Sequence, residues 1–340
     1  MFLPKDLDLH DKETSEHHYD EKYAHKAGFL SQEYMAEWKD EKKDRITDLI
    51  AKLSLPPKGE ALDFGCGSGV LTEVIRKALP GYQVYGTDLS QAALDKARER
   101  YPGCTFFHAD DARYNKKKFD FLFTHHVLEH VYDLQEVAGE IAHYLKPAAV
   151  MLHILPCGNE GSLEYNLCLL REDGFNPQKG GVFFFEDDDH VRRIKTEDIR
   201  NLFLIHNCIL VEDYYSNQYF GAIKWITESN PFKVLKMFNP LKGRDSRAKM
   251  QLIKLGSILT GLNLWRMPIT LLNRLKQNQQ RGLVSSLLYN GCLLLYPLSR
   301  LLDRYVRRLA AAEWRQGRKE RNGSEMYLIY SRSGRKIKQG

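Results

Sequence analysis

The sequence ALDFGCGSG, residues 61–69, decides the fold that we predict for this chain. It begins as a short buried strand, and Asp63 lies at the end of that strand. Gly65, Gly67 and Gly69 follow, and glycine lets a backbone turn sharply and approach a ligand closely where a helix begins. The dinucleotide pattern G-x-G-x-x-G would need a glycine at position 70, where this chain has valine. We therefore expect a strand, a ligand-binding loop and a helix that depart from the dinucleotide fingerprint.

Strand-like and helical runs alternate after this segment. They are LTEVIRKAL (helix), QVYGTD (strand), QAALDKARERY (helix), CTFFHAD and FDFLFT (strands), LQEVAGEIAHYL (helix) and AVMLHIL (strand). Short connections and this alternation predict a parallel sheet with helices on both faces. Another helix is expected at about 196–206, a strand at about 208–215 and a last strand at 326–331.

Acidic residues follow the next two strands at positions that suit a nucleoside. Asp88 in YGTDLS comes nineteen residues after Gly69, where a carboxylate can accept hydrogen bonds from ribose hydroxyls. Asp110 and Asp111 in HADDA lie where an adenine amino group can be held. The alternative is that the glycines only turn the chain and the acids only cap helices. The occurrence of all three features at successive strand ends favours the ligand site.

These motifs resemble those of the class I S-adenosylmethionine-dependent methyltransferases, particularly the small-molecule branch related to ubiquinone-biosynthesis methyltransferases. LDFGCGSG, GTDLS, HADDA, FDFLFTHHVLEHVYDL and AHYLKPAAVMLHILP are similar, in that order, to the family's motifs. The resemblance covers about residues 60–156, with weaker support to 215. It implies an α/β fold, a Rossmann-like doubly wound sheet of seven strands with a helical insertion before the last strand. One departure is that Ala148 and Ala149 replace two glycines usual after Lys-Pro, so the turn before the fifth strand is expected to differ.

The resemblance also implies S-adenosyl-L-methionine as the cofactor and suggests its contacts. Gly65 and Gly67 would pack against the methionine part, Asp88 would bind the ribose, and His125 would line the sulfonium end. Asp111 and Ala112 would hold the adenine. The expected cofactor-binding residues are Asp63, Gly65, Cys66, Gly67, Gly69, Asp88, Leu89, Asp110, Asp111, Ala112 and His125.

The reaction implied is an in-line displacement in which O, N or C of the acceptor attacks the sulfonium methyl group. The enzyme aligns the nucleophile, excludes water and, for a hydroxyl or acidic carbon, removes a proton. Candidate catalytic bases are His126, His153 and His190, which follow strand ends and titrate near neutral pH. Each competes with a structural role, and His130 in the LEH sequence is interpreted as structural. HVRRIKTEDIRNLF resembles the family's substrate segment, which favours His190.

No metal dependence is expected from the sequence. The run HHYDEKYAH at 17–25 belongs to a polar arm over residues 1–28, expected to be loose and solvated or a flap whose Tyr19 and Tyr23 cover the cofactor. The run EDDD at 186–189 is interpreted as a solvated loop. The six cysteines form no C-x-x-C pair and the N-terminal region has no apolar segment of signal-peptide length. Reduced thiols and a cytoplasmic location are therefore expected.

The formal net charge of +6 conceals a strong division along the chain. Residues 220–324 hold 20 basic and 5 acidic residues, a net of +15, which leaves −9 for the rest. The uncharged stretch 282–299 has the minimum length of a membrane span, but Asn290, Pro297 and three serines argue against one. The expected organisation is an N-terminal arm and a helix predicted over 31–54 (1–55), a cofactor-binding core (56–219), a basic leucine-rich helical insertion (220–324), and a final strand with a basic tail (325–340).

Three interpretations of the insertion remain open. Leucine-rich helices with clustered basic residues suit an anionic membrane surface, peripheral on its inner face, or a lid over an amphiphilic substrate. Nucleic acid competes, although leucines predominate over aromatic residues. An ordinary helical subdomain or oligomer interface is the third interpretation. The basic residues are Arg304, Arg307, Arg308, Arg315, Arg318, Lys319 and Arg321.

Two classes of function follow. The first is a methyltransferase acting on O, N or C of a small or amphiphilic metabolite, including a lipid-linked one, with a nucleic-acid methyltransferase as a variant. The second is a non-catalytic cofactor-binding or assembly module on the same fold. The intact glycine and acid motifs favour the enzyme.

Overall fold

The computed structural model describes residues 12–25, 40–174, 190–229, 231–277 and 283–332. The chain divides into two compact units. The first unit comprises 1–156, 188–213 and 326–340, and the second comprises 157–187 and 214–325. This division differs from the predicted core of 56–219, because the buried Leu163 and Leu167 pack in one cluster with Ala222 and Ile226 of the insertion.

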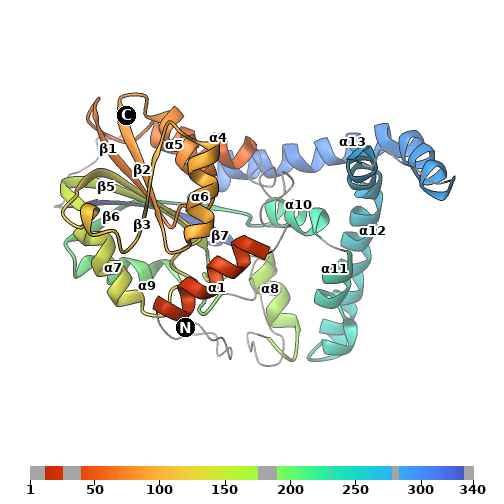
Figure 1. The fold of residues 1–340 in the computed structure, drawn as a ribbon. Coiled ribbons are helices and arrows are strands. Elements are labelled where there is room, and N and C mark those ends of the chain that lie inside the picture. The colour runs from red at the N-terminus through yellow and green to blue at the C-terminus, as the bar shows by residue number, and fades with distance from the viewer. Residues whose placement is uncertain (1–11, 26–39, 175–189, 230, 278–282, 333–340) are drawn as a thin grey trace. The chain divides into compact units, whose positions relative to one another are not determined.

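The first unit contains a sheet of seven strands in the order β3-β2-β1-β4-β5-β7-β6 (Figure 1). Parallel pairs join β1 to β2, β1 to β4, β2 to β3 and β4 to β5. The predicted Rossmann-like sheet is confirmed, and the last strand in the chain lies between β5 and β6. The strands are β1 Gly59–Phe64, β2 Tyr82–Asp88, β3 Thr105–His108, β4 Phe119–His125, β5 Leu145–Pro156, β6 Cys208–Ser216 and β7 Glu325–Arg332.

Helices cover both faces of this sheet. In Figure 1, α4, α5 and α6 lie along one face, and α7 and α9 lie along the other. Phe119, Phe121 and Phe123 of β4 are fully buried, as expected for a central strand covered on both sides. The helices are α4 Asp40–Ile50, α5 Val70–Ala78, α6 Gln91–Arg100, α7 Leu134–His143 and α9 Thr196–Leu204, with a short 3-10 helix η1 at Ala112–Tyr114. Of the helix predicted over 31–54, residues 31–39 lie outside the described residues.

Helix α1, Lys12–His25, corrects the expectation of a loose arm for that part of the chain. The helix has no apolar stripe from which it could be predicted, because it packs on the rest of the unit through polar contacts. Asp20 accepts hydrogen bonds from the Ser90 hydroxyl at 2.7 Å and the Ala92 N–H at 3.1 Å, at the start of α6. Lys96 donates to the main-chain carbonyl of Tyr23 at 2.7 Å. A carboxylate at a helix N-terminus is a favourable arrangement.

The described residues of the second unit are mainly helical. Its helices are α8 Leu163–Leu170, α10 Phe220–Glu228, α11 Pro231–Met237, α12 Ser246–Gln277 and α13 Leu283–Gly317, with η3 at Pro240–Lys242. Asp303 of α13 is buried and binds Arg266 at 3.0 Å and Arg307 at 2.9 Å. Arg307 also binds Glu228 at 2.6 Å, so it serves the interior of this unit and not the basic surface predicted for it.

Helix α13 carries a stripe of exposed leucines. Leu287, Leu294 and Leu301 recur every seven residues and are 65%, 82% and 64% exposed. A seven-residue spacing returns to nearly the same side of a helix, so the three side chains share one face. Arg304 and Arg308, further along the same helix, are also exposed. Among the described residues, no helix is both long and apolar enough to cross a membrane.

Candidate active site

The site is built where the parallel strands end. The register pairs Phe64 at the end of β1 with Thr87 of β2 on one side and Thr124 of β4 on the other. After β1 the chain turns across the sheet edge, and the N–H groups of Gly65 and Cys66 both donate to the Thr87 carbonyl, at 2.8 and 2.9 Å. In open α/β sheets, ligands bind at this edge, outside the carboxyl ends of the strands.

Two positions of the loop require glycine, because of their backbone angles and because of the atoms close to them. Gly65 and Gly67 have φ angles of 73° and 51°, in the left-handed region. A Cβ atom at Gly65 would lie 2.4 Å from the Val127 side chain, and one at Gly67 would lie 2.5 Å from the Tyr23 hydroxyl. Gly69 caps α5, so the loop leads into a helix N-terminus. The loop is therefore a backbone cradle of the kind that a nucleoside ligand approaches closely.

Asp88 lies at the end of β2 and faces this loop. Its Oδ2 atom accepts the Gly67 N–H at 2.8 Å, and its Oδ1 atom accepts the Ser90 N–H at 2.9 Å. Burial raises the pKa of Asp88, and these N–H groups oppose the rise. A carboxylate has about four acceptor positions, and the main chain of Gly67, Leu89 and Ser90 does not fill all of them, so acceptor capacity remains for a ribose hydroxyl. The predicted ribose residue is thus built into the glycine loop.

Asp63 supports the loop from beneath. It is 2% exposed and accepts a hydrogen bond from the Thr72 hydroxyl at 2.6 Å. Burial raises the pKa of Asp63 to about 7, with a smaller contribution from the charge of Asp88. Burial also raises the pKa of Cys66, whose thiol donates to the Gly67 carbonyl at 3.6 Å. The side chains of Asp63 and Cys66 are hydrogen-bonded to groups of the protein itself, so we assign them the role of supporting the loop.

The predicted adenine residues lie next along the same edge. The Leu89 carbonyl is hydrogen-bonded to His108 at 2.8 Å, and Asp110 forms an ion pair with Lys12 of α1. Asp111 caps η1, which starts at Ala112, and pairs with Arg113 at 2.6 Å. The carboxylate of Asp111 is therefore already engaged by Arg113.

Helix α1 lies against the glycine loop. The Tyr23 hydroxyl lies beside Gly67, and the ring of Tyr19 meets the His130 ring edge-on, with 6.1 Å between centroids. These are the two tyrosines predicted to form a flap over the cofactor. His125, at the end of β4, contacts Lys42 of α4 at 3.1 Å.

Two of the three predicted catalytic histidines meet at one buried carboxylate. His126 Nδ1 lies 3.0 Å from Glu129 Oε1, and His190 Nε2 lies 4.0 Å from the same atom. His130 Nε2 lies 4.0 Å from it as well. His126 has a φ of 52°, a left-handed conformation uncommon outside glycine and typical of functional sites. Glu129 and His190 are 1% and 2% exposed.

Sequence reasoning missed Glu129 and interpreted His130 as structural. Burial alone would raise the pKa of Glu129, but the charges of His126 and His130 and a hydrogen bond from His126 hold it below the ordinary value. The spacing H-x-x-E-H at 126–130 was the available signal. The contribution of His190, sixty residues later in the chain, has no local signal.

The third predicted catalytic histidine, His153, does not belong to the group around Glu129. Its side chain is fully buried in β5, stacked on Phe203 of α9 at 4.7 Å and hydrogen-bonded to Thr124 at 2.7 Å. Burial lowers its pKa to about 3. A histidine that stays neutral and has no access to solvent is poorly suited to take a proton from an acceptor.

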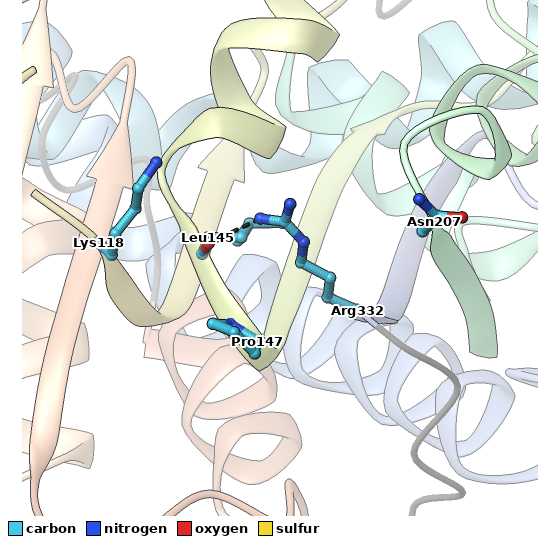
Figure 2. Close-up of a pocket in the computed structure, with 5 residues that line it drawn as sticks. All are labelled: Lys118, Leu145, Pro147, Asn207 and Arg332. Carbon is cyan, nitrogen blue, oxygen red and sulfur yellow. Dashed lines mark hydrogen bonds between the residues drawn. The ribbon is translucent and has the colours of Figure 1, made fainter. Parts of the chain in front are cut away.

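A hollow of about 500 Å³ lies at the ends of the strands opposite to the glycine loop (Figure 2). Lys118 precedes β4 and Leu145 begins β5, so the hollow is at the far ends of these strands from the glycine loop. Arg332 donates to the carbonyls of Ala142 and Leu145 at 2.8 and 2.7 Å, and thereby caps the end of α7. The guanidinium of Arg332 thus has a structural role, and the hollow is separate from the candidate active site.

Comparison with known proteins identifies the family of this chain. Residues 35–212, just over half of the chain, match the family model described as "Methyltransferase domain". The chain therefore belongs to this family, and its sheet is that of the class I S-adenosylmethionine-dependent methyltransferases.

Individual relatives match shorter segments. Trans-aconitate 2-methyltransferase of Variovorax paradoxus (strain S110) is 30% identical over 125 residues, which are 36% of this chain and 48% of that protein. The enzyme of the same name from Yersinia pestis (strain Pestoides F) is 42% identical over 64 residues, 19% of this chain and 25% of that protein. The chain thus spans about half the length of the first relative and a quarter of the second. The solved structure of magnesium protoporphyrin IX methyltransferase from Synechocystis PCC 6803, with bound SAH, is 20% identical. That match covers 62% of this chain and 95% of that chain, with a TM-score of 0.44.

Proposed function

We propose that the protein transfers the methyl group of S-adenosyl-L-methionine to O, N or C of a small or amphiphilic metabolite. The observation that carries this proposal is the hydrogen bond between Asp88 and the Gly67 N–H, which joins a ribose-binding acid to a glycine cradle. Family membership and the trans-aconitate relatives support the same reaction. The proposed cofactor contacts are those expected from the sequence, with Asp63 and Cys66 as supports of the loop.

S-adenosyl-L-methionine, when bound, supplies a methyl group on a positively charged sulfur. The acceptor atom forms the new bond to the methyl carbon as the sulfur–carbon bond breaks, and the electron pair of that bond stays on sulfur. A hydroxyl acceptor also loses its proton, which is released to the bulk solvent outside the site. The protein aligns the acceptor and excludes water from the site. We assign the acceptor side to His126, Glu129 and His190, and we set His153 aside because of its burial. His126 and Glu129 follow β4, where Val127 lies against Gly65 of the loop, and His190 joins them from the segment before α9.

Calorimetry with S-adenosyl-L-methionine tests the first requirement. We expect one site per chain. Methyl transfer from the labelled cofactor is then measured with acceptors of three classes, namely trans-aconitate, a phenol and a lipid extract. Cofactor binding without transfer to any class would favour the non-catalytic binding module. Failure of the protein to bind the cofactor would refute the enzyme.

We further propose that the second unit docks on an anionic membrane surface, which would suit an amphiphilic acceptor. Leu287, Leu294 and Leu301 offer an apolar stripe on α13, and exposed Arg304 and Arg308 follow it on the same helix. Apolar side chains that enter the headgroup region and basic side chains that bind anionic lipid are the two parts of an interfacial helix. The net charge of +15 over 220–324 supports lipid of negative charge.

Co-sedimentation with vesicles tests this surface. The intact protein should sediment with vesicles that contain phosphatidylglycerol and stay in solution with phosphatidylcholine alone. Replacement of the three leucines by serine should abolish sedimentation, whereas Met250→Ser, at an exposed residue of α12, should not. If the triple variant only converts a dimer to a monomer, the stripe is an interface between copies.

A further inference from the structure

Side chains that can ligate a metal ion converge around Glu129. Three imidazoles, those of His126, His130 and His190, approach a single carboxylate oxygen, Glu129 Oε1, at 3.0, 4.0 and 4.0 Å. Glu129 and His190 are 1% and 2% exposed, so the carboxylate and this imidazole lie in the interior. A simple proton relay needs only one imidazole for each carboxylate.

The spacing of these side chains suits a divalent cation. One ligand atom from each of His126, Glu129 and His190 lies within 4.8 Å of the other two. Ligands about 2.0–2.2 Å from a tetrahedral ion are separated by roughly 3.5 Å, so small side-chain movements would close the set. Two imidazoles and one carboxylate form a ligand set known for zinc in enzymes, with a fourth position left open.

The backbone fixes the ligands before any ion binds. The Val191 N–H donates to the Glu129 carbonyl at 3.0 Å, which joins the segment of His190 to that of Glu129. Arg192 donates to the Leu128 carbonyl at 3.1 Å and also to the carbonyls of Val131 and Tyr132. The strained φ of 52° at His126 orients the third ligand. Ligands held in this way lose little freedom when they bind a metal.

We propose that His126, Glu129 and His190 form a binding site for one divalent transition-metal ion, of which Zn²⁺ is the representative. His130 supports the site through its contacts with Glu129 and with the ring of His190, 4.6 Å away. The open position suits an oxygen ligand. On the basis of the proposed function, that oxygen belongs to the acceptor, which would then carry a hydroxyl or carboxylate group.

Metal binding is measured directly, without an activity assay. The chelator-treated protein is titrated with Zn²⁺ by calorimetry, and the bound metal is counted by mass spectrometry. One equivalent is expected. Glu129→Gln and His190→Asn should each weaken this binding at least about 100-fold. The control His143→Asn changes an exposed histidine of α7 and should leave it unchanged.

Cobalt gives a second readout that does not depend on variants. Co²⁺ bound by two imidazoles and a carboxylate with low coordination number gives a visible absorption band, and Zn²⁺ should displace it. A parent protein that takes up neither ion, or binding that persists in both ligand variants when circular dichroism shows them folded, would overturn the proposal. The Asp88→Asn variant should keep the metal while losing cofactor affinity, which separates this site from the methyltransferase assignment.

Discussion

Asp88 Oδ2 accepts the backbone N–H of Gly67 at 2.8 Å, so the acid after β2 and the loop after β1 form one structural unit. A substitution at Asp88 should therefore affect the ligand twice, through the ribose and through the loop. Asp88→Asn removes the charge of the acceptor and should cost about 1.5–3 kcal/mol. Calorimetry should record a loss of S-adenosyl-L-methionine affinity of roughly 10- to 100-fold.

The matched control for this prediction is Asp95→Asn. Asp95 lies on α6 and its side chain is 63% exposed, paired with Arg98 at 2.7 Å. A surface pair contributes little, so this variant should bind the cofactor as the parent does. Equal affinities for Asp88→Asn and Asp95→Asn would exclude Asp88 from the cofactor site.

The contact between Gly67 and Tyr23 predicts a coupled effect. Gly67→Ala should weaken cofactor binding, because alanine disfavours a φ of 51° and its Cβ would lie 2.5 Å from the Tyr23 hydroxyl. Tyr23→Phe in the same chain removes the hydroxyl and leaves the next ring carbon at an ordinary 3.4 Å. The double variant should recover part of the affinity, measured against Tyr23→Phe alone.

Gly261→Ala is the control for the glycine series. A Cβ at Gly261, on α12, would meet nothing within 4 Å. This change should leave cofactor affinity intact and stabilise the helix by up to about 1 kcal/mol. If Tyr23→Phe restores none of the affinity lost in Gly67→Ala, then α1 does not rest on the loop in solution.

His153 should make the protein sensitive to acid. Its pKa is about 3 in the folded chain and 6.5 ordinarily, so below about pH 6.5 the unfolded chain takes up a proton that the folded chain does not. Folding stability is therefore lost as the pH falls. The loss from this residue should reach about 2 kcal/mol between about pH 7.5 and about pH 5.

Denaturant unfolding of the parent and of His153→Phe at both pH values checks this. Phenylalanine can keep the stacking on Phe203 but cannot titrate. The difference in unfolding free energy between the two pH values should be smaller in the variant by about 2 kcal/mol. An identical pH dependence of the two proteins would mean that burial does not lower the pKa of His153.

Ala148 should be a site at which glycine stabilises the protein. Its φ of 62° costs an alanine about 1–2 kcal/mol, and glycine adopts this angle freely. Because glycine also gains freedom in the unfolded chain, Ala148→Gly should raise the unfolding free energy by up to about 1 kcal/mol. The control is the neighbouring residue Ala149, at which φ is not positive. Ala149→Gly should therefore destabilise the strand by about 0.5–1 kcal/mol. Urea unfolding distinguishes the two, and stabilisation by both or neither would contradict the argument.

The sequence predicted those parts of the fold whose signals are local. Buried strands such as FDFLFT read as apolar runs, and the glycines and acids at their ends predicted the ends of the strands at which we place the site. Helix α1 was missed because its docking depends on Asp20 meeting Ser90, seventy residues away, and not on an apolar stripe. Glu129 was missed because its importance lies in convergence with His190, which only the folded chain creates.

The position of β7 has a consequence for synthesis. This strand, Glu325–Arg332, lies between β5 and β6 but is translated after every helix of the second unit. While the ribosome makes those helices, β5 and β6 each keep an unpaired edge, and such edges recruit strands from other chains. A chain cut short just before Glu325 would therefore possess every proposed cofactor residue, and we expect it to be prone to aggregate.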